Sequence, residues 1–303
     1  MNWLSEAIQI THLTQELQMR SLSPSLALGR DRQVYMAWSE QTVQAPQPIH
    51  VYFKRSLDNG ATWPQDGVQI DHAPSPGVQS GASPLMAADE PGNVYMAWEV
   101  RPEFPPGNAI FLNRSSDDGA TWQTADQRID GSFRALLSLY NFQHQPDLLS
   151  ADNQGHVYVI FYQPSGTFPE YFKIAFNSSA DFGATWNPQA KVVMNRPANY
   201  VYHGLEMTAN QNGKIFILTG GITRGGTREH VYLNASRDYG RSWTCKGRGC
   251  QVESIDPVRD GIRTYVGQIS CNQNGRCAII WSDDRTDKTI AERHLYYNTA
   301  DLT

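Results

Sequence analysis

The octapeptide Ser56-Leu57-Asp58-Asn59-Gly60-Ala61-Thr62-Trp63 decides the fold, because the chain repeats it. The further copies keep Ser, Asp, Gly and Trp at the same spacing; they are Ser115–Trp122, Ser179–Trp186 and Ser236–Trp243. Glycine adopts a backbone geometry that other residues resist, and Ser and Asp side chains hydrogen-bond within tight turns. The pattern therefore predicts four equivalent turns, here called box turns, each with its tryptophan packed beneath it.

A second, apolar pattern precedes every box turn and occurs once more near the C-terminus. It resembles Val-Tyr-Met-Ala-Trp and begins at Val34, Val94, Val157, Ile215 and Cys277. A turn signature, Asp or Asn followed three residues later by Gly, stands before the last four. Together the patterns define a unit of about 60 residues that occurs five times and is typical of four short strands. Repeated four-stranded units at this spacing predict an all-β fold, a β-propeller built of antiparallel blades.

The box turns resemble the Asp-box, or BNR repeat, of the sialidase superfamily, and the repeats cover the whole chain. The resemblance implies a β-propeller in which the boxes are structural. Identical turns on different blades lie too far apart to share one substrate, so we assign their aspartates to stapling the turns rather than to catalysis or metal binding. These are Asp58, Asp117, Asp181, Asp238 and, in a partial fifth copy, Asp301.

The two ends of the chain predict the number of blades. Leu295–Thr303 matches the beginning of a box turn and then stops, and Trp3 and Ile10 continue its spacing as though residue 1 followed residue 303. We therefore expect five blades in one domain over 1–303, with Glu6–His12 as the outer strand that closes the ring. Catalytic sialidases have six blades. The expected blades span about 13–72, 73–131, 132–195, 196–254, and 255–303 together with 1–12.

Composition excludes several other classes of protein. The chain has 303 residues, a net charge of −5, 40% apolar residues and 11% aromatic residues, which argues against disorder. No apolar run approaches the about 18 residues of a membrane span. The mild acidity argues against a nucleic-acid partner. Neither a nucleotide-binding glycine loop, nor a metal-ligand spacing, nor a serine nucleophile elbow is present, so we expect no cofactor and no metal.

The cysteines form two local pairs at hairpin spacing, Cys245 with Cys250 and Cys271 with Cys277. Such pairs favour two disulfides and an oxidising compartment, periplasmic or extracellular. A zinc site or four reduced thiols are the alternatives. The N-terminus does not resemble a signal peptide, so an exported protein implies a leader that was removed or replaced by Met1.

Aligning the repeats predicts which residues face the propeller axis. The residues seven places before the apolar pattern are all small, as a crowded axis requires. Because side chains alternate along a strand, the residues nine places before the apolar pattern are expected to face the axis as well. In that row Glu206 is the one charged residue, and an isolated carboxylate there is either functional or a paired, structural one. The two rows are Ala27, Ala87, Ser150, Thr208 and Ser270, and Ser25, Leu85, Leu148, Glu206 and Gln268.

Loops entering the inner strands are expected to form one rim of this channel. Arginines there can grip a carboxylate and tyrosines can cover a sugar face, although each residue also has a purely structural interpretation. The loops differ sharply between blades, as between Asp130–His144 and Asn195–His203, which indicates a single asymmetric site. The predicted ligand-binding residues are Arg20, Arg263, Arg285, Tyr202, His203, Gln268, His144 and Ser25.

The sialidase resemblance breaks down at the catalytic arginines. The family carries Arg-Ile-Pro before its first inner strand, where this chain has Leu22-Ser23-Pro24, so the arginine that holds the substrate carboxylate is missing. A second family arginine is also missing from the first blade, which reads Trp38-Ser39-Glu40-Gln41-Thr42. Sialic acid cleavage therefore does not follow from the resemblance. If the protein is an enzyme, the candidates for its catalytic residues are Glu206, Tyr265, Asp147 and Asp284.

Three functions fit these observations. The first is an exported propeller that binds a glycan, or another small acidic or polar ligand, in one axial pocket. The second is a sialidase-like glycoside hydrolase in which Glu206 acts with Asp147 or Asp284. The third is a non-catalytic scaffold that binds protein partners on its faces.

Overall fold

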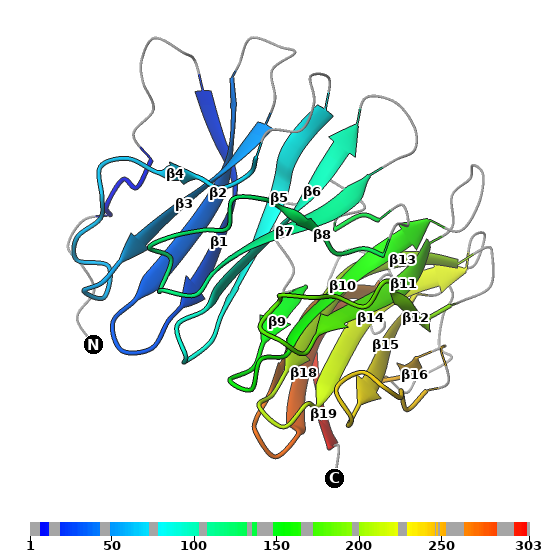
Figure 1. Cartoon of the computed structure of the whole chain (residues 1–303). Coiled ribbons are helices and arrows are strands. Elements are labelled where there is room, and N and C mark those ends of the chain that lie inside the picture. The colour runs from blue at the N-terminus through cyan, green and yellow to red at the C-terminus, as the bar shows by residue number, and fades with distance from the viewer. Residues whose placement is uncertain are drawn as a thin grey trace. The chain divides into compact units, whose positions relative to one another are not determined.

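The computed structural model describes residues 7–11, 19–42, 49–72, 78–102, 108–131, 135–137, 148–164, 172–195, 200–223, 229–245, 247, 249–252, 264–283 and 294–301. Their secondary structure consists of strands in five antiparallel sheets, one for each sequence repeat and each in chain order (Figure 1). The predicted all-β class and antiparallel blades are confirmed. None of the described residues forms a helix that is long and apolar enough to cross a membrane.

Four sheets have four strands and the fifth has three. The first is β1 (Met19–Leu28), β2 (Val34–Thr42), β3 (Ile49–Ser56) and β4 (Val68–Gln69). The second is β5 (Val78–Ala88), β6 (Val94–Pro102), β7 (Ala109–Ser115) and β8 (Gln127–Arg128). The third is β9 (Leu149–Ala151), β10 (Val157–Pro164), β11 (Phe172–Ser179) and β12 (Lys191–Met194). The fourth is β13 (Tyr200–Ala209), β14 (Ile215–Thr223), β15 (Glu229–Ser236) and β16 (Cys250–Gln251). The fifth is β17 (Thr264–Cys271), β18 (Arg276–Asp283) and β19 (His294–Asp301).

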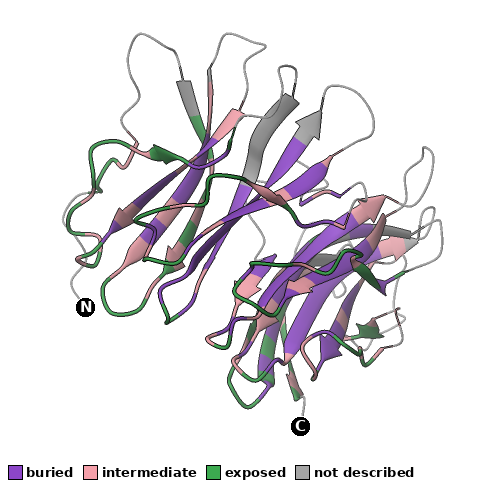
Figure 2. Ribbon diagram, viewed as in Figure 1, coloured by how far each residue is buried: buried purple, intermediate pink, exposed green. Residues whose placement is uncertain are grey.

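The chain divides into two compact units, Met1–Gln127 and Arg128–Thr303, which are described separately below. In the second, third and fourth blades the second strand is the most deeply buried, as the purple strands β6, β10 and β14 of Figure 2 show. Val94 through Trp98 of β6 and Val157 through Phe161 of β10 are each at most 1% exposed. A strand covered on both faces needs apolar residues at successive positions, which explains the continuous Val-Tyr-Met-Ala-Trp pattern.

Each of the four complete box turns is held by its own side chains, as predicted. The predicted fifth box aspartate, Asp301, is wrong: β19 pairs Ala300 with Cys277 as β3 pairs Ser56 with Val34, so Asp301 is equivalent to Leu57 rather than to Asp58. In the first box turn, the Ser56 hydroxyl donates to Asp58 Oδ1 at 2.7 Å and accepts from the Gly60 N–H at 2.9 Å, and the Thr62 hydroxyl donates to Asp58 Oδ2 at 2.6 Å. The same bonds recur in the other three copies. Hydrogen bonds from Thr62 and Ser56 lower the pKa of Asp58 to about 2. The carboxylate is therefore the form that the turn requires.

Two of the box turns also fasten their blade to the preceding blade of the same unit. In the first unit the Trp122 ring packs edge-on against Phe53 of the preceding blade, with ring centroids 4.9 Å apart. Gly119 lies against the same ring, and a Cβ on it would come within 2.5 Å of Phe53. In the second unit Trp243 packs on Phe176 in the same way, at 5.3 Å. Two separate features therefore require glycine at Gly119 and Gly240: the φ angle is positive, and the neighbouring aromatic ring leaves no room for a Cβ.

The hairpin turns between the first two strands of successive blades are linked by glutamines. The Gln211 side chain accepts from the N–H of Asn153 at 2.6 Å, and the Gln273 side chain accepts from the N–H of Gln211 at 3.0 Å. In both contacts the glutamine side chain of one turn accepts a hydrogen bond from the backbone N–H of the equivalent residue in the preceding turn.

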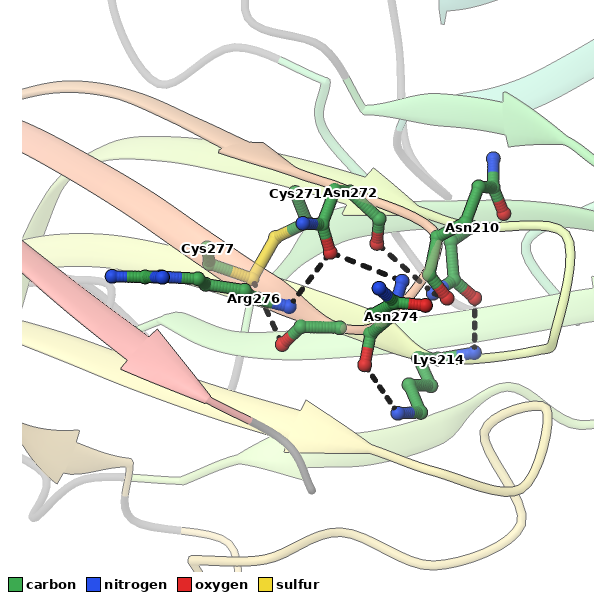
Figure 3. The surroundings of a disulfide bond; sticks show 9 residues. Asn210, Lys214, Cys271, Asn272, Asn274, Arg276 and Cys277 are labelled. Carbon is green, nitrogen blue, oxygen red and sulfur yellow. Dashed lines mark hydrogen bonds between the residues drawn. A yellow bond between two sulfur atoms is a disulfide. The ribbon is translucent and has the colours of Figure 1, made fainter.

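The last of these turns is braced by a disulfide (Figure 3). Cys271 and Cys277 are bonded to each other, and Cys245 is bonded to Cys250, so both predicted disulfides are confirmed. Beside the Cys271–Cys277 bond, the Lys214 ammonium donates to the Asn274 carbonyl at 2.7 Å. Two disulfides indicate an oxidising environment.

The predicted closing strand Glu6–His12 is only partly described. Residues 7–11 lie outside any strand. The carbonyl of Ile10 nevertheless accepts a hydrogen bond from Lys54 Nζ at 2.5 Å. In the second unit the residue equivalent to Lys54 is an asparagine. Its side-chain amide donates to a backbone carbonyl in, or next to, the outer strand of the preceding blade. The pairs are Asn177 with Ile129, Asn234 with Val193 and Asn298 with Val252. Ile10 therefore has the contact expected of an outer strand that precedes the first blade. Closure of the ring stays a prediction.

Candidate functional site

The strand register confirms the row of inner-strand residues that the repeat alignment predicted. Ser25, Leu85, Glu206 and Gln268 each pair with the fourth residue of the second-strand pattern in their blade, and the carbonyl of Leu148 bonds to the equivalent Ile160. Glu206 is therefore the one carboxylate in this row, on β13 of the second unit. Its side chain is buried, with 6% of the residue exposed.

The backbone immediately before Glu206 departs from regular strand geometry. The register between β13 and β14 shifts between His203 and Leu205, so Gly204 is an extra residue, and its φ is 62°. A bulge of this kind bends a strand and changes which way its following side chains point. The Thr219 hydroxyl supports the bulge by donating to the Gly204 carbonyl at 2.8 Å.

Register shifts also precede the equivalent residues Ser25, Leu85 and Gln268, so it is Thr219 that distinguishes blade four. Its position in the second strand holds Trp38, Trp98, Phe161 and Trp281 in the other blades. All four of these aromatic residues are at most 3% exposed. Blade four therefore combines a carboxylate in its inner strand with a small hydroxyl residue in place of a buried ring. Thr219 was not among the predicted site residues, and the break in this aromatic column is the sequence signal that identifies it.

The other predicted site residues that the structure describes have varied surroundings. Tyr202 is 0% exposed, so its ring is not available to stack on a sugar in this structure, contrary to the expectation of a rim tyrosine. Gln268 is exposed, and Ser25 Oγ accepts from the Met86 N–H at 3.1 Å, a bond between the first two blades. The side chains of Arg20, His203 and Tyr265 lie outside the described part of the chain. So do the whole residues Arg263, Arg285, His144, Asp147 and Asp284.

Acidic residues at the far ends of the second strands have structural partners. The indole N–H of Trp38 donates to Glu40 Oε1 at 2.7 Å, and that of Trp281 donates to Asp283 Oδ2 at 2.9 Å. The Glu99 carboxylate accepts from the Asn108 amide, and Glu99 is 0% exposed. These carboxylates hold the second strands and their loops, which leaves Glu206 as the described inner-strand acid.

The long segment between the second and third blades, Asp130–His144, is described in part. Leu136 forms an isolated bridge with Tyr162, in which each N–H donates to the carbonyl of the other at 2.9 Å. Ala135 and Leu137, on either side, are at most 1% exposed. The insertion is therefore anchored to the end of β10 in the second unit, where the sequence predicted one side of the rim.

No protein-family model matches the sequence, and no curated protein matches it. The fold is similar to solved structures of low sequence identity. A leech intramolecular trans-sialidase, complexed with 2,7-anhydro-Neu5Ac, is 12% identical, with a TM-score of 0.55 over 98% of this chain and 64% of that one. A PL25 ulvan lyase is 11% identical, with a TM-score of 0.54 over 94% and 72%. An α-L-arabinanase of Penicillium chrysogenum, complexed with arabinobiose, is 16% identical, with a TM-score of 0.51 over 88% and 78%. At these identities the likeness establishes a shared fold, that of β-propeller proteins which act on glycans.

Proposed function

We propose that this protein is an exported glycan-binding propeller whose ligand lies against the inner strand of the fourth blade, at Glu206. The observation that carries the proposal is the placement of one carboxylate in an otherwise uncharged row of equivalent inner-strand positions. A buried carboxylate is costly, and blade four keeps it where other blades have Ser, Leu or Gln. A carboxylate can accept two hydrogen bonds from neighbouring sugar hydroxyls, which suits a polyhydroxylated ligand.

Further features of the described residues support this proposal. Glu206 lies two residues after the Gly204 bulge, and bulges often occur where a strand presents a side chain to a site. The fold is shared with proteins whose names describe action on sialosides, ulvan and arabinan. Two disulfides agree with export. Under this proposal Arg20, Arg263, Arg285, His203, His144 and Tyr265 complete the rim, and Gln268 lies beside Glu206.

The experiment is a glycan array followed by calorimetry on the best ligand, with three variants. Glu206→Gln keeps the shape and removes the charge. Glu206→Leu installs the residue of the second and third blades in the same row, so the fold accommodates it. Glu90→Gln removes the same charge from an exposed turn and is the matched control. We expect binding that both Glu206 variants weaken at least about tenfold, as loss of a charged hydrogen-bond partner does.

The outcomes separate the candidate functions. Binding that Glu206→Gln leaves unchanged would refute the placement of the ligand at this residue. Release of 4-methylumbelliferone from a panel of fluorogenic glycosides, abolished by Glu206→Gln, would show that the protein is a hydrolase rather than a binding protein. Silence in both assays, together with reproducible capture of a protein partner, would establish the scaffold function.

A further inference from the structure

A groove crosses the junction between the third and fourth blades of the second unit. Its two adjoining cavities have volumes of about 520 and 340 Å³ and share Ser178, Asn187, Pro188, Tyr239 and Arg241 in their walls. The fourth-blade wall is the box turn Ser236–Trp243, and the third-blade wall is the segment that follows Trp186. Cavities of this size take a ligand of several rings rather than a single ion.

An equivalent junction in the first unit shows that an open groove is not a general feature of the fold. There Arg55, which is equivalent to Ser178, donates to the carbonyl of Asp118 at 2.8 Å and to that of Asp117 at 3.3 Å. The Asp118 carboxylate, on the residue equivalent to Tyr239, accepts from the Tyr35 hydroxyl at 3.3 Å and pairs with Arg30 at 3.4 Å. A long side chain and an ion pair thus cross that junction. In the groove Ser178 is too short to do so.

Two cations line the groove, and the repeats show that one of them is specific to it. Arg241 is exposed and stands in the box turn where the other three copies have Ala61, Ala120 and Ala184. Lys191 is also exposed, and its ammonium donates to the Arg241 carbonyl across the groove. An ammonium has three donors, so others are left for a ligand.

The acidic group close to these cations is already engaged within its own turn. Asp238 accepts from the Ser236 hydroxyl at 2.8 Å and from the Ser242 hydroxyl at 2.6 Å. Burial raises the pKa of Asp238, but the hydrogen bonds from Ser242 and Ser236 and the nearby charge of Lys191 bring it below its ordinary value. Asp238 therefore stays ionised and held within its turn, where its charge offsets part of the charge of Lys191.

Aromatic and amide groups complete the walls. The Tyr239 ring packs against His156 with centroids 4.2 Å apart and ring planes tilted by 32°, which holds it in place, while Tyr239 and Trp186 remain partly exposed. Asn187 is exposed, and its amide is oriented by bonds to the carbonyl and hydroxyl of Ser178 at 3.1 and 3.2 Å. Fixed aromatic rings suit the apolar faces of sugars, side-chain amides suit hydroxyls, and Lys and Arg suit carboxylate or sulfate groups.

We propose that this groove is a second binding site, separate from Glu206, for an acidic oligosaccharide that carries uronate or sulfate groups. Arg241 and Lys191 hold the acidic groups, and Tyr239 and Trp186 contact the sugar rings. The proposal does not depend on the site at Glu206, because the groove is built from the box turn of one blade and the outer strand of another.

Calorimetry at low salt tests the proposal with tetragalacturonic acid and a heparin tetrasaccharide as ligands and maltotetraose as the neutral comparison. The first variant is Lys191→Gln with Arg241→Ala, in which both new residues occur at equivalent positions, Gln127 and Ala120. The second is Ser178→Arg with Tyr239→Asp, which places Arg55 and Asp118 of the first-unit junction at the equivalent positions of the groove. Thermal melting and circular dichroism verify that each variant is folded. The third is Glu206→Gln, which leaves the groove unaltered.

We expect at least one acidic tetrasaccharide to bind at low salt and maltotetraose not to bind at the same concentration. Each groove variant should weaken binding at least about tenfold, Glu206→Gln should not affect it, and 0.5 M NaCl should weaken it. Failure of both acidic ligands to bind would overturn the proposal. So would groove variants that bind as the parent does, displacement by inorganic sulfate at the concentration of the oligosaccharide, or equal binding of a phosphorylated peptide. Loss of binding in Glu206→Gln alone would assign the ligand to the other site.

Discussion

The ammonium of Lys54 donates to the backbone carbonyl of Ile10, 44 residues earlier in the chain, at 2.5 Å. It also donates to the carbonyl of Gln65 at 2.7 Å, and Lys54 is 2% exposed. Three other blades use a shorter asparagine for the equivalent contact. The first blade thus reaches the N-terminal segment with a longer side chain than the others need.

Lys54→Met should lower the free energy of unfolding by about 1–3 kcal/mol, because the carbonyls of Ile10 and Gln65 lose a charged donor while the apolar stem is kept. Urea denaturation followed by tryptophan fluorescence measures the change. Lys54→Asn is the matched control, since asparagine occupies this position in the other blades, and it should recover part of the loss. Equal stability of Lys54→Met and the parent protein would show that the N-terminal segment is not held by this bond.

Gly119→Ala should be more destabilising than Gly60→Ala, although both box glycines have similar φ values of 77° and 81°. Each substitution carries the backbone cost of a positive φ, about 1–2 kcal/mol. Only at Gly119 would the new Cβ also meet Phe53, at 2.5 Å, whereas at Gly60 its nearest atom is 3.9 Å away. The overlap should add about 1–3 kcal/mol. Chemical denaturation of the two variants measures the difference, and equal losses would contradict the interpretation that the box turn fastens neighbouring blades.

The protein should lose stability in acid as the box-turn aspartates become protonated. Hydrogen bonds from their own turns lower the pKa values of Asp58 and Asp117 from 3.8 to about 2. Because the folded-state pKa is the lower one, this contribution is fully present above the unfolded pKa of 3.8 and is lost as the pH falls through about 2. Thermal melting between pH 6 and pH 2 follows the loss. Asp58→Asn and Asp117→Asn should each flatten the acid limb, and an unchanged slope would remove these carboxylates from the explanation.

Removing the Cys271–Cys277 bond by a double serine substitution should lower the free energy of unfolding by about 2 kcal/mol, the value expected for closing so short a loop. Removing Cys245–Cys250 should cost less. The first bond braces a turn whose carbonyls accept from Lys214 and Asn210 of the preceding blade, and Cys277 is 1% exposed, whereas Cys250 is exposed (Figure 3). Melting temperatures of the two double variants make the comparison. A larger loss from the Cys245–Cys250 variant would contradict it.

Features that repeat along the chain were predictable from the sequence. The box turns and the inner-strand row that contains Glu206 follow from spacing, because local hydrogen bonding and strand alternation act identically in every repeat. The cysteine spacing favoured both disulfides but left a zinc site and reduced thiols as alternatives. The strand register confirms the row residue by residue.

Features that break the repeat were harder to predict. Gly204 and Gly267 add a residue to the inner strands, so alternation cannot be extended past them, and the rim residues that precede them could not be oriented. The burial of Tyr202 depends on packing that no local pattern describes. The groove exists because Ser178 lacks the reach of Arg55, and that consequence appears only when two blades are placed side by side.

The fastening by box turns bears on how such a chain can arise. Each of the four complete repeats carries an apolar residue at this third-strand position, Phe53, Leu112, Phe176 or Leu233, together with a glycine and a tryptophan in its box turn. Two junctions show the contact between them, Trp122 on Phe53 and Trp243 on Phe176. A duplicated segment of about 60 residues therefore contains the residues for both contacts, with the blade before it and with the blade after it. Copying the segment once lengthens the array through contacts of the same kind, and a shorter side chain in a single copy, as at Ser178, changes the junction between neighbouring blades.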